Sequence, residues 1–232
     1  MSVAGYSLAM DLPWWVGPAG TTILPIGKSG AITAWPGLWL AGMAALAAAV
    51  AIRLMDEQLD KYGDELAFRF TVARFLGDST TSYALLAFCL SALLAAKAAA
   101  VLFLAAYAVG MTGDWQQRLP SGLPAGLEII IVILIGIWGT GPAAMIWGFC
   151  FMAGLQCLDD YVDLKLDALA GQRNLCRLLG SGETLMIGIY LLVCAFRLSP
   201  GLTAVTGLAA IFSYIIWATS AYWWRMWAGQ EG

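Results

Sequence analysis

Six aspartates, repeated at four-residue intervals in two places, have the types and spacing best suited to chemistry. They are Asp56, Asp60 and Asp64 in the first half of the chain and Asp159, Asp163 and Asp167 in the second. On a helix, a four-residue spacing places side chains on one face with a drift of about 40° per step. Carboxylates gathered in this way repel one another, and bound cations relieve that repulsion. Each triplet is therefore a candidate cation site.

Magnesium is the metal that these residue types favour. The chain contains no histidine, and sites made only of oxygen ligands favour Mg²⁺ over zinc, copper or iron. Glu57 and Asp160 complete the candidate metal ligands, although each lies about 100° from the main face of its helix and is weaker on geometry. Mg²⁺ is commonly shared between one or two carboxylates and a substrate phosphate. We therefore expect a phosphate-bearing ligand.

Basic residues follow both acidic segments and are candidates to bind the phosphate oxygens. An arginine can grip such oxygens with two parallel hydrogen bonds. Lys165 also belongs to the set, although it is as well placed to balance local acidic charge. The alternative is a charged loop that obeys topology rules and binds nothing, but two segments with the same spacing favour a function. The candidates are Arg69, Arg74, Lys165, Arg173 and Arg177.

The composition predicts that helices in a membrane position these residues. Hydrophobic residues make up 61% of the 232 residues and charged residues only 12%, against about 25% charged in soluble domains. The absence of histidine excludes Ser-His-Asp and Cys-His nucleophile systems, histidine-ligated haem and most zinc sites. No basic stripe suits nucleic acid. The five cysteines form no C-x-x-C pair, so we expect them to pack as apolar residues.

The apolar runs predict about seven transmembrane helices, with six or eight as alternatives. A span needs about 20 residues. Two runs are too long for one span, so we expect a turn at Lys97 in the first and a break at 139–142 in the second. The segment 1–35 is expected to lie at the interface, and tryptophans of 217–227 to form an interfacial aromatic belt. The apolar runs are 36–54, 81–111, 127–158, 184–196 and 202–224.

The basic residues predict which side the acidic segments face. With seven spans, nine of the twelve lysines and arginines fall on one side. The positive-inside rule makes that side cytoplasmic. We therefore expect a multi-pass protein, of the cell membrane, with both acidic segments at its cytoplasmic face.

An internal repeat relates the two acidic segments. An offset of 103 residues places the first aspartate triplet on the second, Arg74 on Arg177, and Leu76-Gly77 on Leu179-Gly180. The repeat predicts two similar helical halves around a central cavity, 36–111 and 127–232, joined by a linker at 112–126. The two acidic segments should then meet at one end of that cavity.

At these residues the sequence resembles the UbiA superfamily of intramembrane prenyltransferases. The family's first motif is N-D-x-x-D-x-x-x-D, and a second spaced aspartate motif lies in the other half of its fold. Segment 159–167, D-D-Y-V-D-L-K-L-D, fits with Asp in place of Asn, and segment 56–64, D-E-Q-L-D-K-Y-G-D, fits with two acidic replacements. The arginine and "LG" that follow each motif also resemble the family, and the resemblance covers 36–224.

The resemblance implies a helical bundle, usually of nine helices, with a cavity open to lipid. It further implies that Mg²⁺ on both motifs binds a prenyl diphosphate, with Asp60 and Asp163 as the central catalytic aspartates. Ionisation of the diphosphate would then lead to transfer of the prenyl group to a lipid or aromatic acceptor. The chain departs from the family in having room for about seven spans and in lacking the motif asparagine.

Two other functions remain open at this point. The allylic cation could be captured by its own double bonds, which would make the protein a terpene cyclase of the same superfamily. A cation transporter or a non-catalytic membrane protein is the third possibility. A transporter typically carries its acidic residues near the middle of the spans, whereas these acids cluster at span ends.

Overall fold

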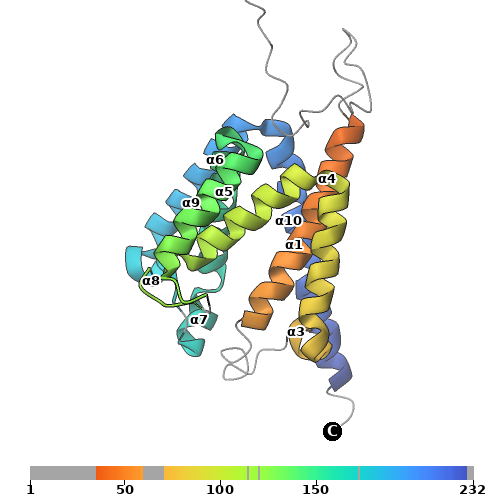
Figure 1. The fold of residues 1–232 in the computed structure, drawn as a ribbon. Coiled ribbons are helices and arrows are strands. Elements are labelled where there is room, and N and C mark those ends of the chain that lie inside the picture. The colour runs from red at the N-terminus through yellow and green to blue at the C-terminus, as the bar shows by residue number, and fades with distance from the viewer. Residues whose placement is uncertain (1–34, 60–70, 114, 120, 172, 229–232) are drawn as a thin grey trace, which may run out of the picture.

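The protein is a bundle of helices in which the short helices gather at one end (Figure 1). The computed structural model describes residues 35–59, 71–113, 115–119, 121–171 and 173–228, and every regular element among them is a helix. Two 3₁₀ turns, Gly77–Ser79 and Met111–Gly113, flank helix α4 (Thr80–Gly110). The α-helices are α1 (Trp35–Leu59), α3 (Val72–Leu76), α4 (Thr80–Gly110), α5 (Ala125–Thr140), α6 (Pro142–Val162), α7 (Leu164–Ala170), α8 (Leu175–Leu179), α9 (Ser181–Leu198) and α10 (Pro200–Ala228).

Five helical stretches of the described chain are long and apolar enough to cross a membrane, and α5 is a shorter apolar helix. The prediction of an all-helical membrane protein is confirmed at this level. The predicted break between α5 and α6 is present, because Gly141 adopts a φ of 96° that favours glycine and Pro142 begins the next helix. The predicted turn between α9 and α10 is also present, at Ser199.

The long helix α4 contains the predicted turn, two residues from the expected position. We expected a turn at Lys97, and Ala95 has non-helical backbone angles at a kink where two helical segments meet (Figure 1). The two segments together have 31 residues, whereas one span needs about 20. Ser199, 104 residues later, has nearly the same backbone angles as Ala95. A proline follows Ser199 and marks that turn in the sequence, whereas the alanines around Ala95 give no such local signal.

Small residues let the helices approach one another closely. On α1, Ala44, Ala48 and Ala51 are fully buried, and the hydroxyl of Ser91 on α4 donates a 2.7 Å hydrogen bond to the carbonyl of Ala44. On α6, Gly148 lies against the Val101 side chain of α4. Without a water-driven hydrophobic effect, helices in lipid associate through this kind of close packing and through hydrogen bonds.

An indole-to-threonine hydrogen bond joins α6 to α10 in the buried core, near the ends where both helices begin. Trp147 is fully buried and donates from Nε1 to Oγ1 of Thr203 over 2.8 Å. The Thr203 hydroxyl in turn donates to the carbonyl of Ala195. The ring of Phe151 stacks on Trp147 with centroids 5.5 Å apart. Thus α6, which carries the second acidic segment, is fixed to both α9 and α10.

The close contact at Gly148 generates a test of the packing. A Cβ added at Gly148 would overlap the Val101 side chain and lie 3.4 Å from the Ala105 Cβ. We expect Gly148→Ala to destabilise the protein by about 1–3 kcal/mol, the usual cost of overpacking. Gly139→Ala is the matched control, because nothing lies within 4 Å of a Cβ at Gly139. Thermal unfolding in detergent measures both, and equal midpoints would contradict the α4–α6 contact.

Candidate functional site

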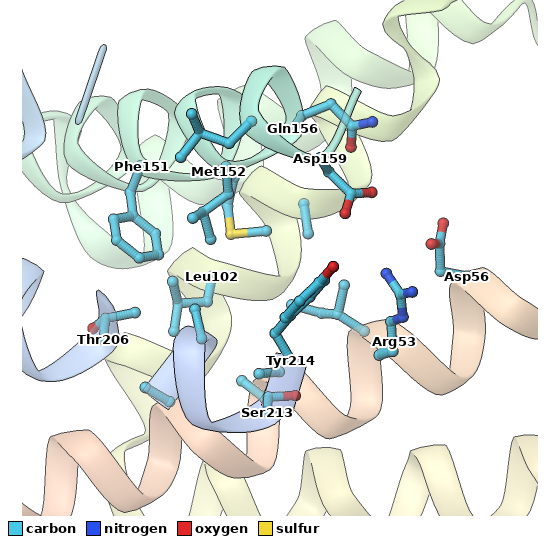
Figure 2. A pocket seen from close by; sticks show the side chains of 18 of the residues that line it. Arg53, Asp56, Leu102, Phe151, Met152, Gln156, Asp159, Thr206, Ser213 and Tyr214 are labelled. Atoms are coloured by element: carbon cyan, nitrogen blue, oxygen red, sulfur yellow. The ribbon is translucent and has the colours of Figure 1, made fainter. Parts of the chain in front are cut away.

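A cavity of about 400 Å³ lies between α1, α4, α6 and α10, within the usual range of small-molecule sites (Figure 2). One end is lined by apolar side chains, including Leu102, Phe151 and Met152, together with alanines of α1. The other end is polar. Figure 2 shows the Arg53 guanidinium, the Tyr214 hydroxyl and two carboxylates at that end. The cavity is therefore amphipathic, with its polar end toward the short helices.

The first acid of each predicted motif lies at this polar end. Asp56 on α1 and Asp159 on α6 both line the cavity, and their carboxylates face the Arg53 guanidinium in Figure 2. The charges of Asp56, Asp160, Asp163 and Arg53 all act on the Asp159 carboxylate. The fold thus brings together two aspartates that are 103 residues apart in the chain.

The second acidic segment is bent, and does not form one continuous helical face. Helix α6 ends at Val162, and Asp163 adopts a non-helical φ of −91° and ψ of 6° before α7 begins. Backbone hydrogen bonds from Asp163 to Asp159 and from Asp167 to Asp163 span the bend. The predicted alignment of the three aspartates on one face is therefore interrupted at Asp163.

Two of the predicted metal ligands are buried and hydrogen-bonded to backbone. The Glu57 carboxylate accepts from the Ala73 backbone N–H over 2.9 Å and from Trp217 Nε1 over 2.6 Å. The Asp160 carboxylate accepts from the Leu175 backbone N–H over 2.8 Å and from a glutamine side chain of α6. Each of these acids therefore fastens the start of the short helix that follows its segment, α3 or α8. Trp217, expected in the interfacial belt, makes a hydrogen bond inside the bundle.

Asp167 is also held by its own segment. Its buried carboxylate accepts from Nδ2 of Asn174 over 2.7 Å. Asn174 caps α8 through a 2.8 Å hydrogen bond from the Cys176 backbone N–H. Thr71, at the same position of the 103-residue offset, caps α3 in a similar way by accepting from the Arg74 backbone N–H. These contacts fix the loop beneath the cavity.

The remaining predicted residues lie away from the cavity lining or outside the described residues. Asp163 is half-buried, and none of the basic candidates that the structure describes lines the cavity. Those candidates are exposed: Arg74, Lys165, Arg173 and Arg177. The other predicted site residues, which lie outside the described part of the chain, are Asp60, Asp64 and Arg69.

Two carboxylates at the polar end of the cavity (its acidic mouth), those of Asp56 and Asp159, are compatible with a magnesium ion. Among the described residues, no group of three or more acidic or cysteine side chains is placed to hold a metal. Mg²⁺, however, commonly takes one or two protein carboxylates and completes its octahedron with water and phosphate oxygens. The donor type and the number at the mouth therefore fit this ion.

Sequence reasoning did not place Arg53 and Gln156 in the cavity. Each lies three residues, or one helical turn, before the first acid of its motif. Both line the cavity, and they correspond to each other at the 103-residue offset. Their residue types could have predicted this position. A charged or amide side chain within an otherwise apolar helix usually faces the bundle interior.

Searches with protein-family models, among curated proteins and among solved structures found no match to this chain.

The hydrogen bonds of the buried acids generate a prediction about stability. Glu57→Ala leaves the Ala73 N–H and the Trp217 indole without an acceptor, and Asp160→Ala does the same to the Leu175 N–H. We expect each to lower stability by about 1–3 kcal/mol, the cost of unpaired buried polar groups. Asp78→Ala, at an exposed side chain, is the control and should change stability little. Unfolding midpoints in detergent compare the three variants, and an equal loss in all three would contradict the structural role of Glu57 and Asp160.

Proposed function

We propose that this protein is an intramembrane prenyltransferase that ionises a prenyl diphosphate and transfers the prenyl group to a lipid or aromatic acceptor. The observation that carries the proposal is the meeting of Asp56 and Asp159 at the polar end of one largely apolar cavity. A charged head with a long apolar tail is the ligand that matches both ends. The similarity of both acidic segments to the UbiA motifs supports the same substrate class.

The proposed architecture is a pseudo-twofold pair of helical halves with seven spans. Helices α3 and α8 begin exactly one 103-residue offset apart, and each is fastened by the second acid of the preceding motif. The similar backbone distortions at Ala95 and Ser199 support the same relation. On this proposal α4 counts as two spans that meet at Ala95, and both acidic segments face the cytoplasm of a cell-membrane protein.

The diphosphate head is proposed to bind at the acidic mouth. Asp56 and Asp159 would hold Mg²⁺ there, with Asp60 and Asp163 as further ligands. When bound, Mg²⁺ would supply the positive charge that stabilises the leaving diphosphate. Glu57, Asp160 and Asp167 support the site by fixing the segments that carry the ligands. The exposed arginines Arg74, Arg173 and Arg177, with Arg69 and Lys165, would close over the phosphates from outside the cavity.

The prenyl tail is proposed to lie in the apolar part of the cavity. The alanines of α1 leave room for the tail, and side chains such as Leu102, Phe151 and Met152 exclude water from it. A dry site protects the allylic cation from hydrolysis after the carbon–oxygen bond breaks. Transfer requires an acceptor that reaches this cation from the membrane. Without one, the cation would react with its own double bonds, as in a terpene cyclase.

The proposed function predicts Mg²⁺-dependent binding that requires both halves. Purified protein is titrated with farnesyl and geranylgeranyl thiodiphosphates, which ionise slowly, in Mg²⁺ or in EDTA. We expect Asp56→Asn and Asp159→Asn each to weaken Mg²⁺-dependent binding at least about tenfold, because each substitution removes a proposed metal ligand. A tenfold loss of affinity corresponds to about 1.4 kcal/mol of binding free energy. Asp78→Asn, at an exposed acid outside the cavity, is the control.

Product analysis separates the chemical alternatives. Pyrophosphate release that requires a membrane lipid extract indicates transfer, and release with a cyclic hydrocarbon product indicates cyclisation. Binding that is unaffected by EDTA and by both asparagine variants would contradict a two-motif metal site. Absence of any diphosphate binding would leave a non-catalytic membrane protein.

A further inference from the structure

Arg53 lines the cavity but has no role in the function proposed above. Among the described residues that line the cavity, it carries the only positive charge. Its side chain reaches the polar end, where Figure 2 shows the guanidinium beside the carboxylates of Asp56 and Asp159. A cation between two acids could simply balance charge. The buried Nε of Arg53, which has no partner, and the depth of the residue in the cavity indicate a second role.

The Nε atom of Arg53 is buried and has no hydrogen-bond partner. A buried N–H without a partner costs free energy, so such groups are usually satisfied by a ligand or by water. The corresponding residue of the second half, Gln156, donates to Asp160, the acid four residues later. Arg53 makes no equivalent hydrogen bond to Glu57, the acid four residues after it, because the Glu57 carboxylate already accepts from Trp217 and from the Ala73 backbone. Arg53 is therefore a lining residue of the cavity with a buried donor that has no partner.

The depth of Arg53 indicates which part of a ligand it meets. It lies one helical turn before Asp56 on α1, which is about 4.5 Å farther into the bundle. The lining residues that precede it on α1 are Ile52 and three alanines, all apolar. Arg53 therefore stands at the border between the acidic mouth and the apolar part of the cavity. In an amphipathic ligand, this is where the head joins the tail.

We propose that Arg53 is a substrate-positioning residue that binds the phosphate directly attached to the prenyl tail. The inference rests on the proposed function. The guanidinium lies beside the carboxylates of Asp56 and Asp159 in Figure 2. With Mg²⁺ held by these two acids, the planar guanidinium, including its Nε, would donate hydrogen bonds to oxygens of that phosphate. The metal and the arginine would then bind the same head group.

Farnesyl monophosphate tests the proposal, because it keeps the tail-attached phosphate and lacks the outer one. Equilibrium binding in detergent is measured in Mg²⁺ for farnesyl monophosphate, for farnesyl thiodiphosphate and for farnesol. We expect Arg53→Gln and Arg53→Lys to weaken both phosphate ligands at least about tenfold and to leave farnesol unchanged. Lysine keeps the charge but lacks the fork, so it should not rescue. Arg197→Lys, at an exposed arginine of α9, is the matched control.

Mg²⁺ binding without ligand separates this role from charge balance and from folding. Removing the competing cation in Arg53→Gln should leave Mg²⁺ affinity unchanged or tighten it, whereas a merely structural arginine would weaken metal and ligand together. Wild-type levels of phosphate binding in Arg53→Lys would overturn the proposal. If Arg53→Gln does not fold, the lysine variant decides alone. If the wild-type protein binds farnesol and both phosphates equally, the proposed function fails together with this inference.

Discussion

A carboxylate near the end of an apolar helix needs hydrogen-bond donors, because little water reaches it and an unpaired buried charge is costly. In this protein Glu57 and Asp160 meet that requirement with backbone N–H groups at the starts of α3 and α8. These N–H groups have no partner within their own short helices. One contact therefore satisfies both the acid and the helix start. Through this contact, the short helix that follows each acidic segment is held against the long helix that precedes it, α3 against α1 and α8 against α6.

This closure assigns different roles to neighbouring acids. Glu57 and Asp160 face inward and hold structure, so that Asp56 and Asp159, one residue earlier, turn toward the cavity. Adjacent residues on a helix differ by about 100° in direction, and the fold uses that difference. The acids that lie off the main face of the motif are thus the ones that hold the short helices, whereas the first acids line the cavity.

The cavity itself depends on residue size. Alanines on α1 and glycine at 148 on α6 allow α1, α4 and α6 to approach closely on one side. The hydrogen bond between Trp147 and Thr203 then fixes α10 against α6. Such contacts matter in a membrane, where helix association relies on close packing and on polar contacts. A largely apolar space remains between the four helices, with the acidic residues at one end.

The sequence by itself determined that the protein is helical and suited to a membrane, because composition and run length depend on no long-range contact. It also located the breaks at Gly141-Pro142 and Ser199-Pro200, where proline and glycine act locally. It placed the turn of the long run at Lys97, and the structure has this turn two residues earlier, at Ala95, because no proline or glycine fixes its position there and tertiary packing decides it. The sequence further indicated that Asp56 and Asp159 belong together, through the 103-residue offset.

Only the tertiary structure decided which acids line the cavity and which hold the short helices. The difference between Asp56 and Glu57 depends on Ala73 and Trp217, which lie 16 and 160 residues away in the chain. The surroundings of Arg53 likewise depend on α6, which brings Asp159 to the same end of the cavity. Spacing along one helix gives the direction of a side chain, whereas its partners come from other helices. For that reason the residue types of the site were legible in the sequence, and their roles were not.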